Sequence, residues 1–145
     1  MDIKQSKAYG TKKEVKMIEG LGEIYKVKGS YQFGGRDNHF TGQFSVDTSG
    51  RITGKIWDPN SICSEHEVKG EVKEGQDDAA LLEFVKIPTG ILADIYYQLQ
   101  KVSDPKNKLA GVYDGVWSFK EEILPIPIVE GTEGETENQA HIELK

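Results

Sequence analysis

Apolar side chains recur at every second position between residues 23 and 119, and this alternation constrains the fold more than any other feature of the chain. In the first run, Tyr25, Val27 and Tyr31 alternate with mostly polar residues. A period of two is typical of a strand that buries one face and exposes the other, as antiparallel strands commonly do. The pattern predicts seven consecutive strands, at residues 24–33, 39–46, 51–58, 67–73, 79–86, 91–101 and 109–119.

The links between these runs are short and contain turn-forming residues such as Gly34-Gly35 and Asp47-Thr48-Ser49-Gly50. Short links favour strands that pair in chain order, and a long meander tends to close because closure removes exposed edges. We therefore predict an all-β fold, an antiparallel up-and-down meander closing into a barrel of about eight strands. A sandwich of two sheets is the alternative. Inward glycines in mid-strand, which relieve crowding inside a small barrel, favour the barrel: Gly29, Gly42, Gly54, Gly70 and Gly111.

The two ends of the chain differ in composition from this central part. Residues 1–22 form a basic N-terminal arm, in which Thr11-x-x-Glu14 is a capping box and predicts a short helix at residues 12–19. The barrel domain is assigned to residues 23–119, and an acidic tail follows at residues 120–145.

An eighth strand has two candidate positions in this tail. Ile123–Val129 is apolar, but Pro125 and Pro127 both lack N–H groups on the same side, so this segment can pair along one edge only. Ala140–Leu144 is short and alternating, and it could supply a closing strand. The pattern leaves open whether the barrel closes through the tail.

Charge and cysteine content argue against several function classes. The formal net charge is -6, and most of it lies in the tail, where seven glutamates face two lysines. An acidic chain argues against nucleic acid as a partner, and the lack of a long apolar run argues against a membrane-spanning helix. The single cysteine, Cys63, cannot form an intrachain disulfide, which favours a cytoplasmic location. The histidines lack metal-ligand spacing, so neither a metal nor a cofactor is predicted.

Repeated Gly-x-apolar strands, with Gly29-Ser30-Tyr31 in the first, resemble the small eight-stranded barrels of calycin type, the avidin and lipocalin relatives. The resemblance covers roughly residues 22–119 and rests on strand pattern. It implies a barrel that holds a small ligand.

The two ends of the predicted barrel are unlike each other. Strand direction alternates in a meander, so the ends of odd-numbered strands meet the starts of even-numbered ones at one rim. That rim combines aromatic and polar side chains, whereas the other has tight turns and apolar residues. Such asymmetry is typical of a pocket with one mouth. The residues of the polar rim are Tyr31, Phe33, Phe40, Asp58, His66, Lys86, Trp117 and Phe119.

The leading functional hypothesis is a non-catalytic protein that binds a small apolar or aromatic ligand. Aromatic rings would stack on the ligand, Asp58 and His66 would orient it, and Lys86 would meet an anionic group. Plainer interpretations exist, because polar residues at strand ends often face solvent and aromatic residues often fill cores. The candidate ligand-binding residues are Tyr31, Phe40, Asp58, His66, Lys86, Tyr97, Tyr113 and Trp117.

Two alternatives belong to other classes. In the first, the barrel is a filled scaffold, and Leu124–Val129 with the acidic tail engages a protein partner or a second copy of the chain, giving a homo-oligomer. In the second, Asp58 and His66 act as an acid–base pair in a small-molecule isomerase or hydrolase.

Overall fold

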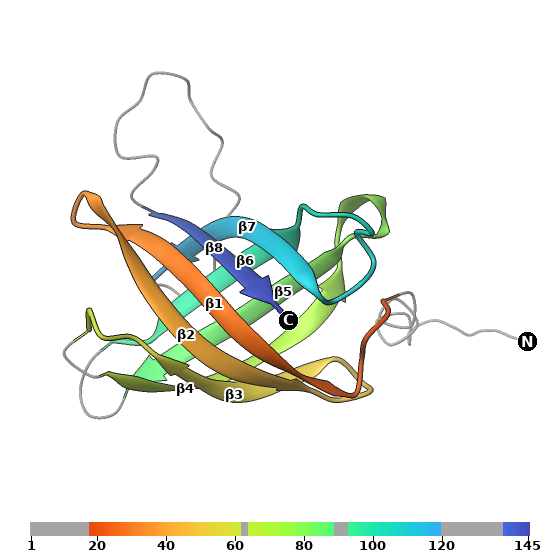
Figure 1. Cartoon of the computed structure of the whole chain (residues 1–145), viewed down its shortest axis with the longest axis horizontal. Coiled ribbons are helices and arrows are strands. Elements are labelled where there is room, and N and C mark those ends of the chain that lie inside the picture. Colours follow the sequence, from red (N-terminus) through yellow and green to blue (C-terminus); the bar gives the residue numbers. More distant parts are fainter. Residues whose placement is uncertain (1–17, 62–63, 89–92, 120–137) are drawn as a thin grey trace, which may run out of the picture.

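The computed structural model describes residues 18–61, 64–88, 93–119 and 138–145, which form a closed barrel of eight antiparallel strands (Figure 1). Each strand pairs with its neighbours in the sequence, and the last pairs with the first. This confirms the predicted all-β up-and-down barrel over the two-sheet sandwich. The strands are β1 (Glu23–Phe33), β2 (Arg36–Val46), β3 (Arg51–Trp57), β4 (Glu65–Glu74), β5 (Ala80–Pro88), β6 (Ile95–Lys101), β7 (Gly111–Ser118) and β8 (Gln139–Leu144).

Strand β8 closes the barrel between β1 and β7. Its Leu144 pairs with Val27 of β1 on one side and with Gly111 of β7 on the other. Two backbone hydrogen bonds of 2.9 Å between Lys26 and Lys145 extend the pairing with β1. The barrel therefore includes residues 139–144, which belong by composition to the acidic tail. The other candidate strand, at residues 123–129, lies outside the described residues.

The predicted helix at residues 12–19 falls almost wholly outside the described residues. Of its last two positions, Ile18 is buried in the core and Glu19 forms an isolated parallel bridge with Lys108. The backbone of Glu19 accepts a hydrogen bond of 2.9 Å from the N–H of Leu109 and donates one of 2.7 Å to Asn107. The segment before β1 thus lies against the connection between β6 and β7.

Inward-facing side chains fill the middle of the barrel. The ring of Phe84 stacks on Tyr97 with centroids 4.8 Å apart and meets Phe44 edge-on at 5.1 Å. Space is so limited that a Cβ atom at Gly70 would collide with the carbonyl oxygen of Glu83 on the paired strand and with Phe84. Glycine at this position lets β4 and β5 approach each other, as the sequence pattern predicts.

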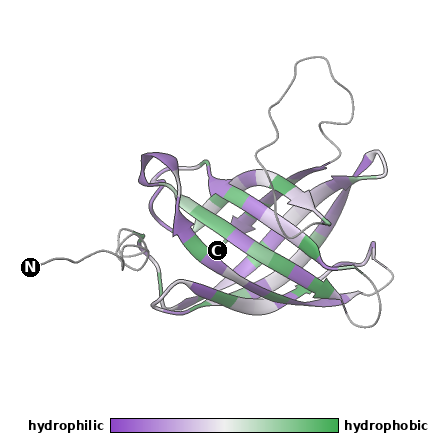
Figure 2. Ribbon diagram, turned by 180° about the vertical axis from the view of Figure 1, so that it is seen from behind, coloured by the Kyte–Doolittle hydropathy of each residue, from purple (hydrophilic) through white to green (hydrophobic). Residues whose placement is uncertain are grey.

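Hydropathy alternates along the strands, as the view from behind shows (Figure 2). Strand β5 departs from the simple pattern because Leu81, Val85 and Ile87 on its outward face are half-buried. Within the described ranges, no helix has both the length and the apolar character needed to cross a membrane.

Candidate functional site at one end of the barrel

A buried ion pair lies inside the barrel at one end, which we call the mouth. Asp58 directly follows β3 and Lys86 belongs to β5, and both side chains are fully buried. The Lys86 ammonium lies 3.1 Å from Oδ2 of Asp58, and Tyr31 of β1 donates a hydrogen bond of 2.6 Å to the same oxygen. Three strands that are far apart in the sequence therefore meet at one carboxylate.

The second oxygen of Asp58 binds the loop that follows it. Its Oδ1 accepts hydrogen bonds from the backbone N–H of Asn60 at 3.0 Å and from Nδ2 of Asn60 at 3.2 Å. Burial by itself would raise the pKa of Asp58, but the hydrogen bond from Tyr31, the Lys86 charge and the Asn60 N–H hold that pKa below its ordinary value. Asp58 is therefore an ionised carboxylate, and both of its oxygens accept hydrogen bonds.

Aromatic rings surround the charged end of Lys86. Its Nζ lies 4.5 Å from the ring centroid of Tyr31, 5.3 Å from Phe40 and 5.4 Å from Tyr97. Ring faces attract cations, and the attraction strengthens when water is absent. Burial lowers the pKa of Lys86, while the Asp58 carboxylate offsets part of that change. Removing either member would leave an uncompensated buried charge, which costs ~3–5 kcal/mol in proteins.

Two polar groups in this cluster lack hydrogen-bond partners among the described residues, Nδ1 of His66 and the hydroxyl of Tyr97. His66 belongs to β4 and is only 1% exposed. Burial lowers the pKa of His66, and the nearby Lys86 charge lowers it further, against smaller opposite effects of Asp58 and an Ile56 hydrogen bond. The imidazole therefore resists protonation, and the cluster holds one positive charge beside Asp58 in preference to two.

A cavity of about 160 Å³ lies above this cluster and is here called the mouth cavity. Tyr31 belongs to both, because its ring lines the cavity while its hydroxyl reaches Asp58. Trp117 is fixed by a hydrogen bond of 3.0 Å from Nε1 to the carbonyl oxygen of Gln32, and its ring meets Tyr31, Phe33 and Phe119 nearly edge-on. The cavity is lined by Tyr31, Phe33, Asn38, Asn60, Ser61, Ile95, Trp117 and Phe119.

The structure brings most of the predicted site residues together at the mouth. Asp58, His66 and Lys86 are buried in the barrel, so the plainer interpretation of solvated strand ends is wrong for these three. Tyr113 is separate: it lies toward the opposite end of β7, where its hydroxyl donates a hydrogen bond of 2.7 Å to Leu109. The residues at the mouth are Tyr31, Phe40, Asp58, His66, Lys86, Tyr97 and Trp117.

Sequence reasoning missed the two asparagines of the mouth cavity. Asn38 directly precedes the strand predicted at residues 39–46, yet it belongs to β2, is buried, and lies in phase with the inward Phe40. That phase was the available signal. Asn60 follows Asp58 in a loop, where no periodicity marks a side chain as inward.

Cys63 lies outside the described residues. In the ranges that are described, no three histidine, cysteine or acidic side chains are grouped as a metal site requires. Comparisons of the chain with protein-family models, with curated proteins and with solved structures found no match.

Proposed function

We propose that this protein binds a compact aromatic small molecule in the mouth cavity without transforming it. The observation that supports this most is the cavity itself, which is lined by aromatic residues of β1 and β7 and by two asparagines, and which shares Tyr31 with the buried ion pair. Concave sites lined by rings and a few polar groups are typical of ligand pockets. The interior below the cavity is packed with side chains, so the ligand would sit at the mouth and not at the centre of the barrel.

The volume limits the ligand to about one or two fused rings. The cavity of about 160 Å³ is close to the size of an apolar cavity of ~150 Å³ known to admit benzene, and smaller than the ~300 Å³ at which pockets for larger ligands begin. A lipid chain or a large cofactor would extend beyond it. Single aromatic rings and indole are suitable in size.

The polar groups favour a ligand that donates a hydrogen bond. Nδ2 of Asn38 points to three backbone carbonyl oxygens, of Tyr31, Phe33 and Arg36. Nδ2 of Asn60 donates to the His39 carbonyl and to Asp58. Since an amide nitrogen has only two hydrogens, both residues would meet a ligand through their amide oxygens, which only accept. A phenol, an aromatic amine or an indole supplies the matching donor.

The ion pair has a supporting role in this proposal. Asp58 accepts a hydrogen bond from the Tyr31 hydroxyl and attracts the Lys86 ammonium, which lies over the Tyr31 ring. These contacts fix the floor of the cavity before a ligand binds. Preorganised sites lose less entropy on binding. We favour binding over Asp58–His66 catalysis because the hydrogen bonds of the Asp58 carboxylate run to Tyr31, Lys86 and Asn60.

The two tryptophans provide a direct test. Trp117 lines the cavity, whereas Trp57 is exposed at the end of β3 and is not among the lining residues. In Trp57→Phe, titration with phenol, with excitation at a wavelength that phenol does not absorb, should quench or shift the emission of Trp117. In Trp117→Phe, the same titration should leave the emission of Trp57 unchanged. Equal responses in both variants, or none in Trp57→Phe at millimolar ligand, would contradict the proposal.

A further inference from the structure

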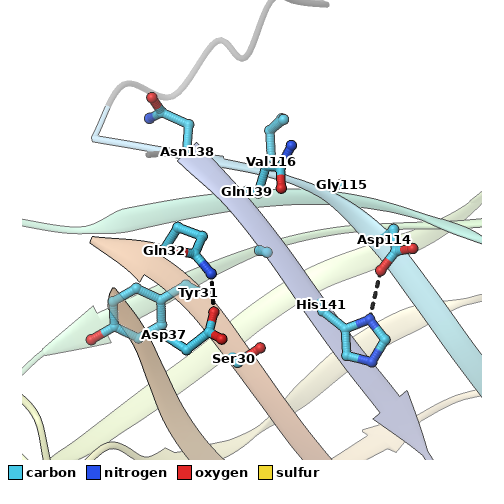
Figure 3. A pocket seen from close by; sticks show the side chains of 11 residues that line it. Ser30, Tyr31, Gln32, Asp37, Asp114, Gly115, Val116, Asn138, Gln139 and His141 are labelled. Carbon is cyan, nitrogen blue, oxygen red and sulfur yellow. Dashed lines mark hydrogen bonds and ion pairs between the residues drawn. The ribbon is translucent and has the colours of Figure 1, made fainter. Parts of the chain in front are cut away.

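A groove of about 440 Å³ crosses the outer surface of β4, β5 and β6, and we call it the side groove. Another groove of equal volume runs along β1, β8 and β7 (Figure 3). The tyrosine that borders this other groove, Tyr31, directs its hydroxyl inward to the buried Asp58, and most of the remaining lining residues are polar. The side groove differs because it combines an outward aromatic ring with polar side chains. Its volume falls within the range of ~300–1,000 Å³ that is typical of ligand sites.

Tyr96 supplies the aromatic ring of the side groove. In β6 it alternates with the buried Tyr97 and Leu99, so its half-buried side chain faces outward. Val85 of β5 pairs with Tyr96, and Lys69 of β4 pairs with Val85. Directly opposed residues on one face of a sheet have Cβ atoms ~4.5–5.5 Å apart. The side groove therefore has an apolar strip, made of a ring and an aliphatic side chain, that ends at a lysine.

A fixed network of polar side chains lies beside this strip. Nζ of Lys73 lies 2.8 Å from Oε1 of Glu83, and Nε2 of Gln98 donates a hydrogen bond of 2.8 Å to Oε2 of the same carboxylate. Burial by itself would raise the pKa of Glu83, but the contacts with Lys73 and Gln98 hold that pKa below its ordinary value. The ionised carboxylate thus orients one side chain from each neighbouring strand.

The network keeps hydrogen-bonding capacity for a ligand. An ammonium has three hydrogens, and a side-chain amide has two hydrogens and an oxygen that accepts. The contacts with Glu83 take one hydrogen of Lys73 and one of Gln98. The Lys73 side chain is 50% exposed, so a ligand can reach its ammonium. Gln98 lies two residues from Tyr96 on the same face of β6, which places them ~6.8 Å apart along the strand.

The charges of the side groove cancel. Among the described residues that line it, Lys69 and Lys73 are balanced by Glu71 and Glu83. A lining without net charge, but rich in donors and acceptors, suits a neutral ligand with many hydrogen-bonding groups better than an anion or a cation.

We propose that the side groove binds a neutral pyranose sugar, stacked on Tyr96 and hydrogen-bonded to Gln98 and Lys73. A pyranose matches both parts of the groove, because carbon-bound hydrogens cover its flat faces and hydroxyl groups, which donate and accept, surround its edge. The apolar face packs on the Tyr96 ring, and the edge reaches the polar network. Glucose in β linkage has the flattest faces, since all its ring substituents are equatorial.

This site is separate from the mouth cavity. Tyr96 faces outward, whereas its neighbour Ile95 lines the mouth cavity and Tyr97 is buried in the core. Because the polar network is formed before a sugar binds, ordering it costs little on binding. Exposed ion pairs contribute only ~0–1 kcal/mol to stability, so substitutions in the network leave the barrel folded.

Cellobiose, a disaccharide of β-linked glucose, is the probe for the first test. Titration of the isotope-labelled full chain should shift the amide resonances of Tyr96, Gln98 and Lys73 most, and the shifts should saturate in the millimolar range. Mannitol, a polyol that has no ring and therefore no flat face, should leave these resonances in place. Equal shifts with both compounds, shifts confined to other strands, or no saturable shift would overturn the proposal.

Substitutions at the ring and at the network are the second test. Tyr96→Ala should weaken cellobiose binding at least tenfold, whereas Tyr96→Phe keeps the ring and should bind within threefold of wild type. Gln98→Ala should weaken binding severalfold. Trp57→Ala removes an exposed aromatic residue that does not line the side groove, so it is the matched control and should bind as wild type does. Unchanged binding in Tyr96→Ala, or an equal loss in Trp57→Ala, would overturn the proposal.

Phenol, the probe of the mouth cavity, distinguishes the two sites. The affinity for cellobiose should be the same with and without saturating phenol. Competition between them would place the sugar at the mouth and would overturn the assignment to the side groove.

Discussion

The barrel buries two lysines, and it holds them in different ways. At the mouth, Lys86 pairs with the Asp58 carboxylate at 3.1 Å and is surrounded by aromatic rings. At the other end, Lys101 donates to two backbone carbonyl oxygens, of Pro105 at 2.8 Å and of Lys108 at 2.6 Å. Burial lowers the pKa of both lysines. Their difference lies in the partner, which is an ionised side chain in one case and neutral backbone in the other.

This contrast separates a charge that supports a site from one that supports a loop. The carbonyls that bind Lys101 belong to the connection between β6 and β7, so Lys101 stabilises the conformation of that connection. Lys86 and Asp58 lie instead beneath the mouth cavity, where Tyr31 connects them to its floor. The effects of substitutions at the two ends on the free energy of unfolding should therefore differ in size and in their dependence on pH.

The largest effect is expected from Asp58→Ala. The variant leaves the Lys86 ammonium buried without a counter-charge, and we expect the free energy of unfolding to fall by ~3–5 kcal/mol in urea denaturation. Asp37→Ala, which removes an exposed aspartate of β2, should change it by less than ~0.5 kcal/mol.

The double variant Asp58→Asn with Lys86→Met tests whether charge is the cause. It removes both charges, so it should be clearly more stable than Asp58→Ala. If the double variant is as unstable as Asp58→Ala, packing and not the unpaired charge explains the loss.

An intermediate effect is expected from Lys101→Met. This variant loses two charge-assisted hydrogen bonds but leaves no charged partner behind, and we expect the free energy of unfolding to fall by ~2 kcal/mol. Proteolysis between β6 and β7 should become faster as the link loosens, measured as the rate of the first cut. A loss as large as that of Asp58→Ala, with the link still protected, would show that the two lysines are held in equivalent ways.

A pH dependence of the free energy of unfolding is also expected, and it arises from His66 at the mouth. The pKa of His66 is lowered in the folded state, chiefly by burial and then by the Lys86 charge, so the unfolded chain takes up this proton first. The contribution of His66 is therefore fully present above its ordinary pKa of ~6.5 and is lost as the pH falls toward the folded value. Between pH 7 and 5, wild type should lose up to ~1.4 kcal/mol per pH unit more than His66→Phe. Lys101→Met should keep the wild-type slope, and equal slopes in wild type and His66→Phe would contradict this origin.

The barrel could be predicted because each strand carries its own periodic signal. Tyr25 and Val27 alternate with lysines in β1, and short turns fix the order in which such strands pair. Closure through the tail could not be predicted, because Ala140–Leu144 is a short alternating run and nothing local says that it reaches β1. Which partner a strand finds across the sequence depends on closure of the whole barrel.

The site could be predicted in part for the same reason. Alternating strand direction places Tyr31, Asp58 and Lys86 at one end, as expected. Their contacts depend on how the strands are staggered around the barrel, which periodicity does not encode. Lys101 was not singled out, although it lies in phase with Tyr97 and Leu99, because a lysine at a strand end usually faces water.

The order of the strands also has a consequence for how the chain folds. Strand β1 pairs with β2, its neighbour in the sequence, whereas its other edge stays unpaired until β8 has docked. The partners on that edge are distant in the sequence, because Val27 of β1 pairs with Leu144 of β8. Such distant contacts form late, and an open edge in the meantime is a template for pairing with another molecule. The outward positions of β1 carry Lys26 and Lys28, and charges of this kind discourage edge-to-edge association. These lysines therefore protect the chain most in the interval before the barrel has closed.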